Sequence, residues 1–275
     1  MTARALPLSG AVFTILSGLI EERLGLFFPA EDSDVLADKI SPRAVECGFD
    51  SLLDYYYYLR YDAGAAEELE RLAEALVVNE TYIGRELDQL SALTDILVPR
   101  LLSERSRIRI WSAACSTGEE PVTLAGMLSD RGLLPRVELV ASDISQRVLA
   151  IAKKGRFSGR SLRALPAASS GWLEIDGAIA TAKPELLGAV SFRQLNLSDR
   201  NAVRQVGKVD VLLCRNVLIY FRDTMIKAVV DSLVEALNPG GYLLVGASES
   251  LLRFSAGLQC EEHGGAFFYR KGHAE

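Results

Sequence analysis

Residues 108–121 of the chain read IRIWSAACSTGEEP, an apolar run that passes into a turn of small residues and then into two glutamates. The isoleucines and Trp111 predict a buried strand over residues 108–113. The small-residue turn that follows, up to Gly118, leads to a helix predicted over residues 122–128. A strand, a tight turn and a helix form the opening unit of a parallel α/β sheet, and ligands bind such sheets at that turn.

The same alternation continues along the chain. Further strands are predicted over residues 137–141, 209–214, 242–245 and 266–270, and further helices over 144–152 and 225–237. Residues 238–241, Asn-Pro-Gly-Gly, predict a helix stop and a turn. This pattern indicates a doubly wound parallel sheet. Residues 155–192 are rich in Gly, Ser and Ala and lack a helical period, so we expect a small inserted β element there.

The first part of the chain has a different pattern. Residues 10–75 carry apolar side chains at helical spacing, which predicts an all-helical segment. One of its helices runs into four consecutive tyrosines, Tyr55–Tyr58. Because Leu52, Tyr55 and Leu59 share one helical face, we expect that face to be packed core rather than an aromatic docking surface. A further helix over residues 67–76 is charged enough to be solvated on one side.

Composition excludes several classes of protein. The 275 residues contain 30 Lys and Arg against 36 Asp and Glu, a formal charge of −6, which argues against a nucleic-acid-binding protein. The four cysteines lie far apart and there are only two histidines, so we expect no metal site. Scattered thiols suit a reducing cytoplasm. The uncharged stretch of residues 5–20 is too short to span a bilayer and predicts a buried helix.

Two acidic residues point to the kind of ligand. The turn after the first strand lacks the GxGxxG pattern of dinucleotide sites, and Glu119 would repel a phosphate. A ligand with an amine or a sulfonium fits better, although a carboxylate at a helix start can simply complement the helix dipole. Asp143, at the end of the second strand, can accept hydrogen bonds from both hydroxyls of a ribose. Its alternative role, shared with Ser142, is that of a helix N-cap.

A third candidate element follows the strand over residues 209–214. Arg215 and Asn216 lie at its carboxyl end, in the crevice where the ligand must bind, and Asn216 brings both a donor and an acceptor. Tyr220 lies four residues further on, with a phenol that can reach a reacting group.

Taken together, these strings resemble the CheR-type chemotaxis receptor methyltransferases. The matching blocks occur in family order: NET…RE at residues 79–86, IWSAACSTGEEP at 110–121, SDI at 142–144, NL at 196–197, CRNVLIYF at 214–221 and PGG…SES at 239–250. The resemblance implies a helical N-terminal domain over residues 1–78, a linker over 79–90 that contributes to the cofactor site, and a methyltransferase domain over 91–275. That domain would be a Rossmann-like class I methyltransferase sheet, with a β subdomain inserted at about 155–192.

The resemblance also implies an activity, transfer of a methyl group from S-adenosylmethionine to glutamate side chains of a chemoreceptor. The product would be a glutamate methyl ester, used for adaptation in chemosensory signalling. By position, the residues expected to line the cofactor site are Asn79, Thr81, Arg85, Glu119, Asp143, Asn196, Leu197, Arg215 and Asn216. Arg85 and Tyr220 would position the substrate glutamate as the catalytic pair. The substrate would be the cytoplasmic helical region of the receptor, and we expect a cytoplasmic monomer that neither binds nucleic acid nor inserts into the membrane.

Two features depart from the family pattern. The family has a Phe-Phe pair where this chain has Ile83-Gly84, and Gly84 is expected to loosen the backbone beside Arg85. The family's N-terminal domain offers a basic helix to an acidic receptor segment, whereas residues 1–90 here hold seven Lys and Arg against 17 Asp and Glu. Like charges suppress association. Two alternatives therefore stay open, a non-catalytic cofactor-binding regulatory module and a methyltransferase acting on a protein that is not a receptor.

Overall fold

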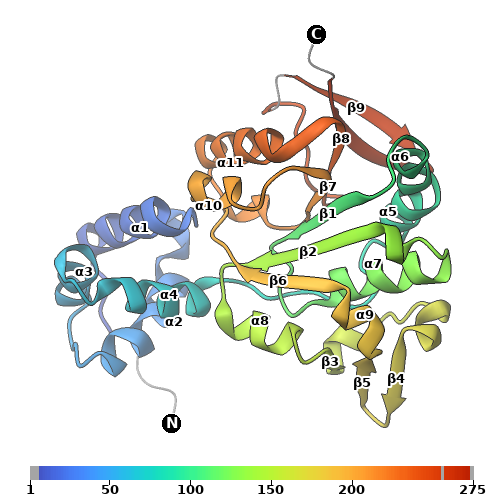
Figure 1. Ribbon diagram of the computed structural model, residues 1–275. Helices are drawn as coiled ribbons and strands as arrows, with labels where there is room; N and C mark the ends of the chain where they lie inside the picture. Colours follow the sequence, from blue (N-terminus) through green and yellow to red (C-terminus); the bar gives the residue numbers. More distant parts are fainter. Residues whose placement is uncertain (1–5, 255–256, 273–275) are drawn as a thin grey trace. The chain divides into compact units, whose positions relative to one another are not determined.

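The computed structural model describes residues 6–254 and 257–272 and divides into two compact units. One unit comprises the described residues up to Val78 together with Tyr220–Met225, and the other comprises the remainder of the described chain (Figure 1). Among the described residues, no helix is long and apolar enough to cross a membrane. The predicted apolar helix begins at Gly10, and residue 5 of the predicted stretch lies outside the described residues.

The first unit is a set of helices: α1 Gly10–Leu24, α2 Ser33–Glu46, α3 Leu52–Tyr61 and α4 Ala65–Leu76, with a short 3-10 turn at Ala30–Asp32. Ser9 caps α1 and Ser51 caps α3 through their side-chain oxygens. The predicted core face of α3 is confirmed, because Leu52, Tyr55 and Leu59 are all buried.

A buried ion pair supports this helical unit. Glu68 of α4 has a side chain only 2% exposed, and it pairs with Arg43 of α2. The hydroxyl of Tyr55 donates a second hydrogen bond to Glu68 at 2.6 Å. One charged residue of the helix predicted to be solvated on one side is therefore part of the core, with its charge compensated.

The second unit contains a seven-stranded sheet in the order β6-β2-β1-β7-β8-β10-β9. Its strands are β1 Ile108–Ala113, β2 Val137–Asp143, β6 Val190–Gln194, β7 Val209–Cys214, β8 Leu237–Val245, β9 Leu258–His263 and β10 Ala266–Lys271. The first five pair in parallel, and β10 and β9 complete one edge in antiparallel fashion. The predicted doubly wound sheet is confirmed. The chain adds β2 and β6 on one side of β1, and it adds β7 and β8 on the other side. The carboxyl ends of β1 and β7 therefore form the crevice where ligands bind.

Helices lie against both faces of this sheet (Figure 1). They are α5 Leu87–Ala92, α6 Val98–Glu104, α7 Glu119–Asp130, α8 Gln146–Ala152, α9 Pro184–Gly188, α10 Arg200–Arg204 and α11 Asp223–Ala236. Short 3-10 turns occur at Leu134–Arg136, Gly159–Leu162, Ala167–Gly171 and Leu218–Tyr220. A π-helical turn, Leu93–Leu97, joins α5 to α6. Helices α5 and α6 and strand β9 were not predicted from the sequence.

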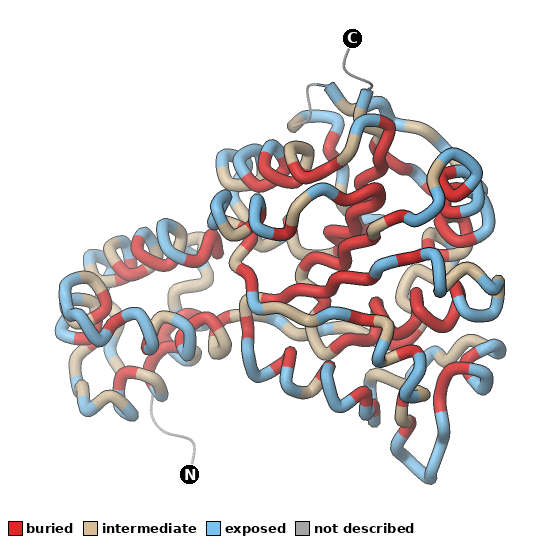
Figure 2. The backbone as a smooth tube through the Cα atoms, in the orientation of Figure 1, coloured by how far each residue is buried: buried red, intermediate tan, exposed pale blue. Residues whose placement is uncertain are grey.

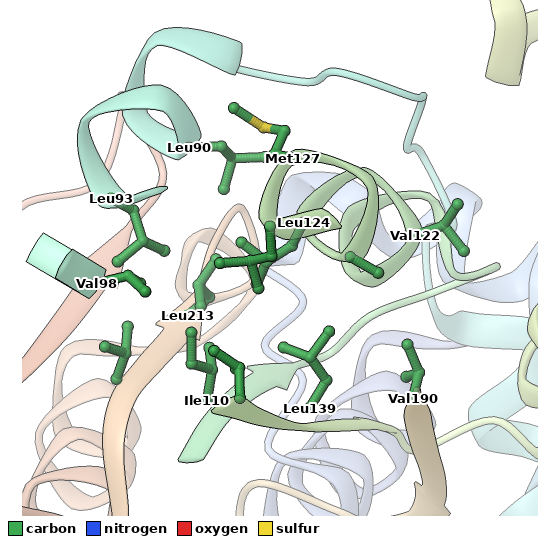
Figure 3. Packing of buried hydrophobic residues seen from close by; sticks show 14 of the residues in the cluster. Leu90, Leu93, Val98, Ile110, Val122, Leu124, Met127, Leu139, Val190 and Leu213 are labelled. Atoms are coloured by element: carbon green, nitrogen blue, oxygen red, sulfur yellow. The ribbon is translucent and has the colours of Figure 1, made fainter. Parts of the chain in front are cut away.

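A hydrophobic core of this unit lies on one side of the sheet (Figure 3). Leu93 and Val98 pack there with Ile110 of β1 and Leu213 of β7, and all four are fully buried. The central strands are buried along most of their length (Figure 2). This packing fixes the strand ends, and with them the loops that carry the site.

The inserted element is a small antiparallel sheet in the order β3-β5-β4, formed by β3 Arg156–Ser158, β4 Leu173–Asp176 and β5 Ile179–Ala182. It confirms the expected inserted β element. At the end of the stretch predicted over residues 155–192, β6 begins at Val190 and pairs with β2. The last residues of that stretch therefore belong to the main sheet.

The helix stop predicted at residues 238–241 is confirmed, because α11 ends at Ala236, but the turn predicted there is wrong, because these residues lie inside β8. A register irregularity opposite Val209–Val211 accommodates them. At Gly241 a Cβ would lie 2.8 Å from the carbonyl oxygen of Asp210, so the glycine is required for close strand approach rather than for a turn.

Candidate functional site

The turn after β1 is the backbone centre of the site. Ala114 and Ser116 both have positive φ angles, 57° and 50°. In the described part of the chain only two other non-glycine residues share this conformation, Glu86 and Asn216, and both lie in the segments described below. Such a conformation costs free energy and is retained at sites where the backbone must take a particular shape. Four such residues in one region therefore mark it as functional.

Asp143, at the carboxyl end of β2, is hydrogen bonded to this turn. Its carboxylate accepts the backbone N–H of Ser116 at 2.9 Å and that of Ser145 at 3.0 Å. Burial raises the pKa of Asp143, and these backbone hydrogen bonds offset the rise only in part. The N-cap alternative is wrong, since Ser145 caps α8 and Ser142 instead accepts the indole N–H of Trp111.

Glu119 opens α7 and is completely buried. One carboxylate oxygen accepts the hydroxyl of Thr117 at 2.7 Å, and the other accepts the hydroxyl of Ser161 at 2.6 Å. Across residues 6–254 and 257–272, no cationic side chain pairs with Glu119 or with Asp143. Two buried carboxylates without a protein cation favour a cationic ligand.

Arg215 follows β7, and its side chain is only 2% exposed. Its guanidinium pairs with Glu120 of α7 at 2.7 Å and with Glu86 at 3.0 Å. It also donates to the side chain of Gln89 and to the carbonyl oxygen of Arg85. Arg215 thus joins β7, α7 and the segment before α5. Burial alone would raise the pKa of Glu86, but the charge of Arg215 and neighbouring donors outweigh it and lower the pKa.

The next residue, Asn216, is held by a carboxylate from a distant loop. Glu249 accepts the backbone N–H groups of Asn216 at 2.7 Å, Val217 at 3.0 Å and Leu218 at 2.8 Å. It also accepts the N–H of Gly246 at 2.7 Å. This single side chain therefore fixes the loops after β7 and β8 together. The amide side chain of Asn216 donates to Glu86 at 3.0 Å.

The segment over residues 79–86 forms another wall. Arg85 donates to the carbonyl oxygen of Glu80 at 2.6 Å, and no carboxylate among the described residues pairs with it. The expected loosening at Gly84 is wrong. Its N–H donates to the hydroxyl of Thr123, and a Cβ at this position would lie 2.6 Å from Pro166. With a φ of 79°, Gly84 is the residue that this close contact requires.

The remaining predicted site residues lie in three different parts of the structure. The N–H of Leu195 donates to the carbonyl oxygen of Asp143 at 2.8 Å, which puts Asn196 and Leu197 directly after a contact with the β2 end. Asn79 and Thr81 precede Arg85 and are half-buried. Tyr220 belongs to the helical unit, where its carbonyl oxygen accepts the N–H of Phe27 at 2.9 Å. The catalytic pairing of Arg85 with Tyr220 stays a prediction.

Five residues of this network had no role assigned from the sequence: Glu86, Gln89, Glu120, Ser161 and Glu249. Glu120 and Glu249 lie inside the family strings, which was a signal that each has a role. Ser161 and Gln89 carry no local signal, because their partners lie 42 and 126 residues away.

Comparison with known proteins identifies this arrangement. Residues 79–263 match the family model described as CheR methyltransferase, SAM binding domain, and residues 11–77 match CheR methyltransferase, all-alpha domain. The chain belongs to the CheR methyltransferase family. Accordingly, it is a methyltransferase and S-adenosylmethionine is its cofactor.

Relatives within the CheR family extend over most of the chain. It is 37% identical over 245 residues to chemotaxis protein methyltransferase 2 of Vibrio cholerae, covering 86% of this chain and 84% of the relative. It is 34% identical over 257 residues to a chemotaxis protein methyltransferase of Vibrio parahaemolyticus, covering 90% and 92%. Among solved structures, the N-methyltransferase NodS of Bradyrhizobium japonicum matches at 15% identity over 64% of this chain and 84% of NodS, with a TM-score of 0.39. A likeness that low adds nothing to the assignment.

The residues present fit this cofactor. S-adenosylmethionine carries a sulfonium and an ammonium, and the site offers two buried carboxylates that pair with no cation among the described residues. The cofactor also carries ribose hydroxyls, and Asp143 presents a carboxylate at the end of β2, in the crevice where such sheets bind ligands. The buried hydroxyl oxygen of Ser116 has no hydrogen-bond partner among the described residues, so a polar group of a ligand can satisfy it.

Proposed function

We propose that this chain methylates glutamate side chains of a chemoreceptor, forming methyl esters that adjust signalling. The observation that carries the proposal is the pair of buried carboxylates, Glu119 and Asp143, on either side of the strained turn after β1. Bound S-adenosylmethionine supplies an electrophilic methyl group. Glu119 and Asp143 hold the cofactor, together with Asn79, Thr81, Arg85, Asn196, Leu197, Arg215 and Asn216.

The chemistry suits a site without a strong general base. A glutamate carboxylate is ionised at neutral pH, with a usual pKa of about 4.3, and so is already a nucleophile. Catalysis then depends on orientation and on excluding water. Arg85 is the side chain proposed to orient a carboxylate, because no carboxylate of the described chain neutralises its charge. Tyr220 is proposed to act with it on the substrate glutamate.

The experiment uses purified protein, radiolabelled S-adenosylmethionine and the cytoplasmic fragment of a chemoreceptor from the same organism. Base-labile release of labelled methanol from the receptor fragment is expected, and it should be lost when the receptor's methylated glutamates are changed to Ala. Asp143→Ala should abolish both methylation and binding of S-adenosylhomocysteine. Cofactor binding without any methanol release from receptor fragments would contradict the receptor as substrate.

A second candidate substrate follows from the charges of α2. Its exposed positions include Asp34, Asp38 and Glu46. Its two cations are engaged elsewhere, because Lys39 donates to the carbonyl oxygen of Leu76 at 2.8 Å and Arg43 pairs with Glu68. An anionic outer face favours a substrate protein with basic surroundings. Faster methylation of glutamates in a basic helical peptide than in an acidic one would select this alternative.

We further propose that the protein acts in the cytoplasm. All four cysteines are free thiols, which suits a reducing compartment. A monomeric state and the absence of nucleic-acid binding remain predictions, and size-exclusion chromatography with light scattering tests the first of these directly.

A further inference from the structure

Ser161 connects the inserted element to two walls of the cofactor site. It lies in the 3-10 turn Gly159–Leu162 that follows β3. Its hydroxyl donates to Glu119 at 2.6 Å, and its carbonyl oxygen accepts the N–H of Ile83 at 2.9 Å. One residue of the insertion therefore contacts both the start of α7 and the segment that carries Arg85.

This contact belongs to a larger interface between residues 161–166 and residues 80–84. Arg163 pairs with Glu80 at 2.8 Å and lies 3.9 Å above the ring of Tyr82. Pro166 packs so close to Gly84 that a Cβ at residue 84 would have no room. Such an interface holds Ser161 in a defined place, so its hydroxyl is a fixed donor rather than a chance surface contact.

The energetic reason for this donor lies in the burial of Glu119. A completely buried carboxylate needs hydrogen-bond donors, and those on the carboxylate oxygens are the hydroxyls of Thr117 and Ser161. Removing the Ser161 hydroxyl leaves one oxygen without its donor. The carboxylate would then be free to rotate about its remaining donor, and that change weakens its attraction for a cationic ligand.

We propose that Ser161 is a positioning residue of the cofactor site, acting through Glu119, so that the inserted element completes the site. The proposal rests on the assignment of Glu119 to the cofactor under the proposed function. Because it concerns cofactor binding alone, it is tested without any receptor.

The test measures binding of S-adenosylhomocysteine by isothermal titration to the full-length chain. Ser161→Ala is expected to raise the dissociation constant about tenfold, in keeping with loss of a hydrogen bond to a charged group. Ser161→Thr, which keeps the hydroxyl, should restore binding to within about twofold of the unaltered chain. Ser170→Ala is the matched control, because Ser170 is exposed in the same insertion and its hydroxyl contacts only a local carbonyl.

A comparison in a second background separates positioning from a general structural role. Once Glu119→Gln has removed the charge, adding Ser161→Ala should cost much less than tenfold, whereas a merely structural role would give the same fold-change in both backgrounds. That comparison holds even if Ser161→Ala lowers the urea midpoint. Unchanged binding in Ser161→Ala, with weakened binding in Glu119→Gln, overturns the inference alone. Unchanged binding in Glu119→Gln overturns the assignment of Glu119 and the inference together.

Discussion

The carboxylate of Glu249 lies 2.7 Å from the backbone nitrogen of Asn216, 33 residues earlier in the chain. Asn216 has a φ of 59°, a conformation that non-glycine residues seldom adopt. The same carboxylate also binds the N–H groups of Val217, Leu218 and Gly246. A negatively charged acceptor shared by four amides offsets the cost of this loop conformation.

Glu249→Gln should therefore destabilise the protein and impair cofactor binding. A glutamine turns its amide N–H2 group toward one pair of backbone N–H groups, and the unsatisfied donors cost about 1–3 kcal/mol. Urea unfolding and titration with S-adenosylhomocysteine measure the two effects. Glu262→Gln, at an exposed position of β9, is the control and should stay within about 0.5 kcal/mol. A Glu249 variant as stable as that control would show that the loop holds its own conformation.

Arg215→Ala should be among the most damaging single changes in the sheet unit. It would leave Glu86 and Glu120 without their shared cation in a largely buried setting, a situation that costs about 3–5 kcal/mol. Arg215→Lys keeps the charge but loses the fork that reaches four acceptors, so it should recover only part of the stability. Urea midpoints at neutral pH rank the three proteins. Equal midpoints for the Lys and Ala variants would contradict the importance of the charge.

Gly84→Ala should destabilise the chain and weaken cofactor binding together. The new Cβ would lie 2.6 Å from Pro166, at a residue with positive φ. To relieve this overlap, residues 161–166 must move, and these residues include Ser161, whose hydroxyl donates to Glu119. We expect a loss of about 1–3 kcal/mol, measured by urea unfolding. Gly188→Ala, in α9 with nothing within 4 Å of the added carbon, is the matched control and should have little effect.

In the helical unit, Arg43→Ala should expose the cost of burying Glu68. Burial raises the pKa of Glu68, but hydrogen bonds from Arg43 and Tyr55 outweigh it, so the pKa is lowered from its usual value. A lowered carboxyl pKa contributes stability above the unfolded value, and that contribution is lost as the pH falls through the folded value. The variant should lose about 3 kcal/mol at pH 7.

The gap in free energy of unfolding between this variant and the unaltered chain should therefore narrow as the pH falls through the acid range, because Glu68 takes up its proton at a higher pH in the variant. Urea titrations across that range of pH measure the gap. Arg71→Ala is the control, because its ion pair with Glu67 is exposed on both sides and should contribute less than about 1 kcal/mol. A gap for Arg43→Ala that stays constant with pH would exclude Glu68 as its cause.

The sequence predicted the parts of the fold that local patterns determine. Strand β7 was predicted to the residue, because its segment 209–214 is apolar apart from Asp210 and is buried on both faces. Helices α5 and α6 were missed, since a π-helical turn at Leu93–Leu97 separates them and shifts the apolar spacing. Strand β9 was missed because its residues are exposed or only half-buried, as befits an edge.

The candidate site likewise has parts that local sequence patterns predict and parts that they do not. Asp143 and Glu119 could be singled out because a strand end and a helix start are visible in the sequence. Their surroundings could not be predicted, since Ser161 approaches from the insertion and Glu249 from the loop after β8. Contacts over such separations depend on tertiary packing. The expected looseness at Gly84 failed for this reason, as its neighbour Pro166 lies 82 residues further along the chain.

The long reach of Arg215 also orders events during biosynthesis. Glu86 and Glu120 leave the ribosome well before their cation does, because Arg215 follows Glu86 by 129 positions. At ordinary rates of translation, the nascent chain carries these carboxylates for on the order of ten seconds without their partner. Glu249 emerges later still. A nascent chain that ends before β8 lacks the contacts of Glu249, so we expect it to leave the proposed cofactor site unfinished.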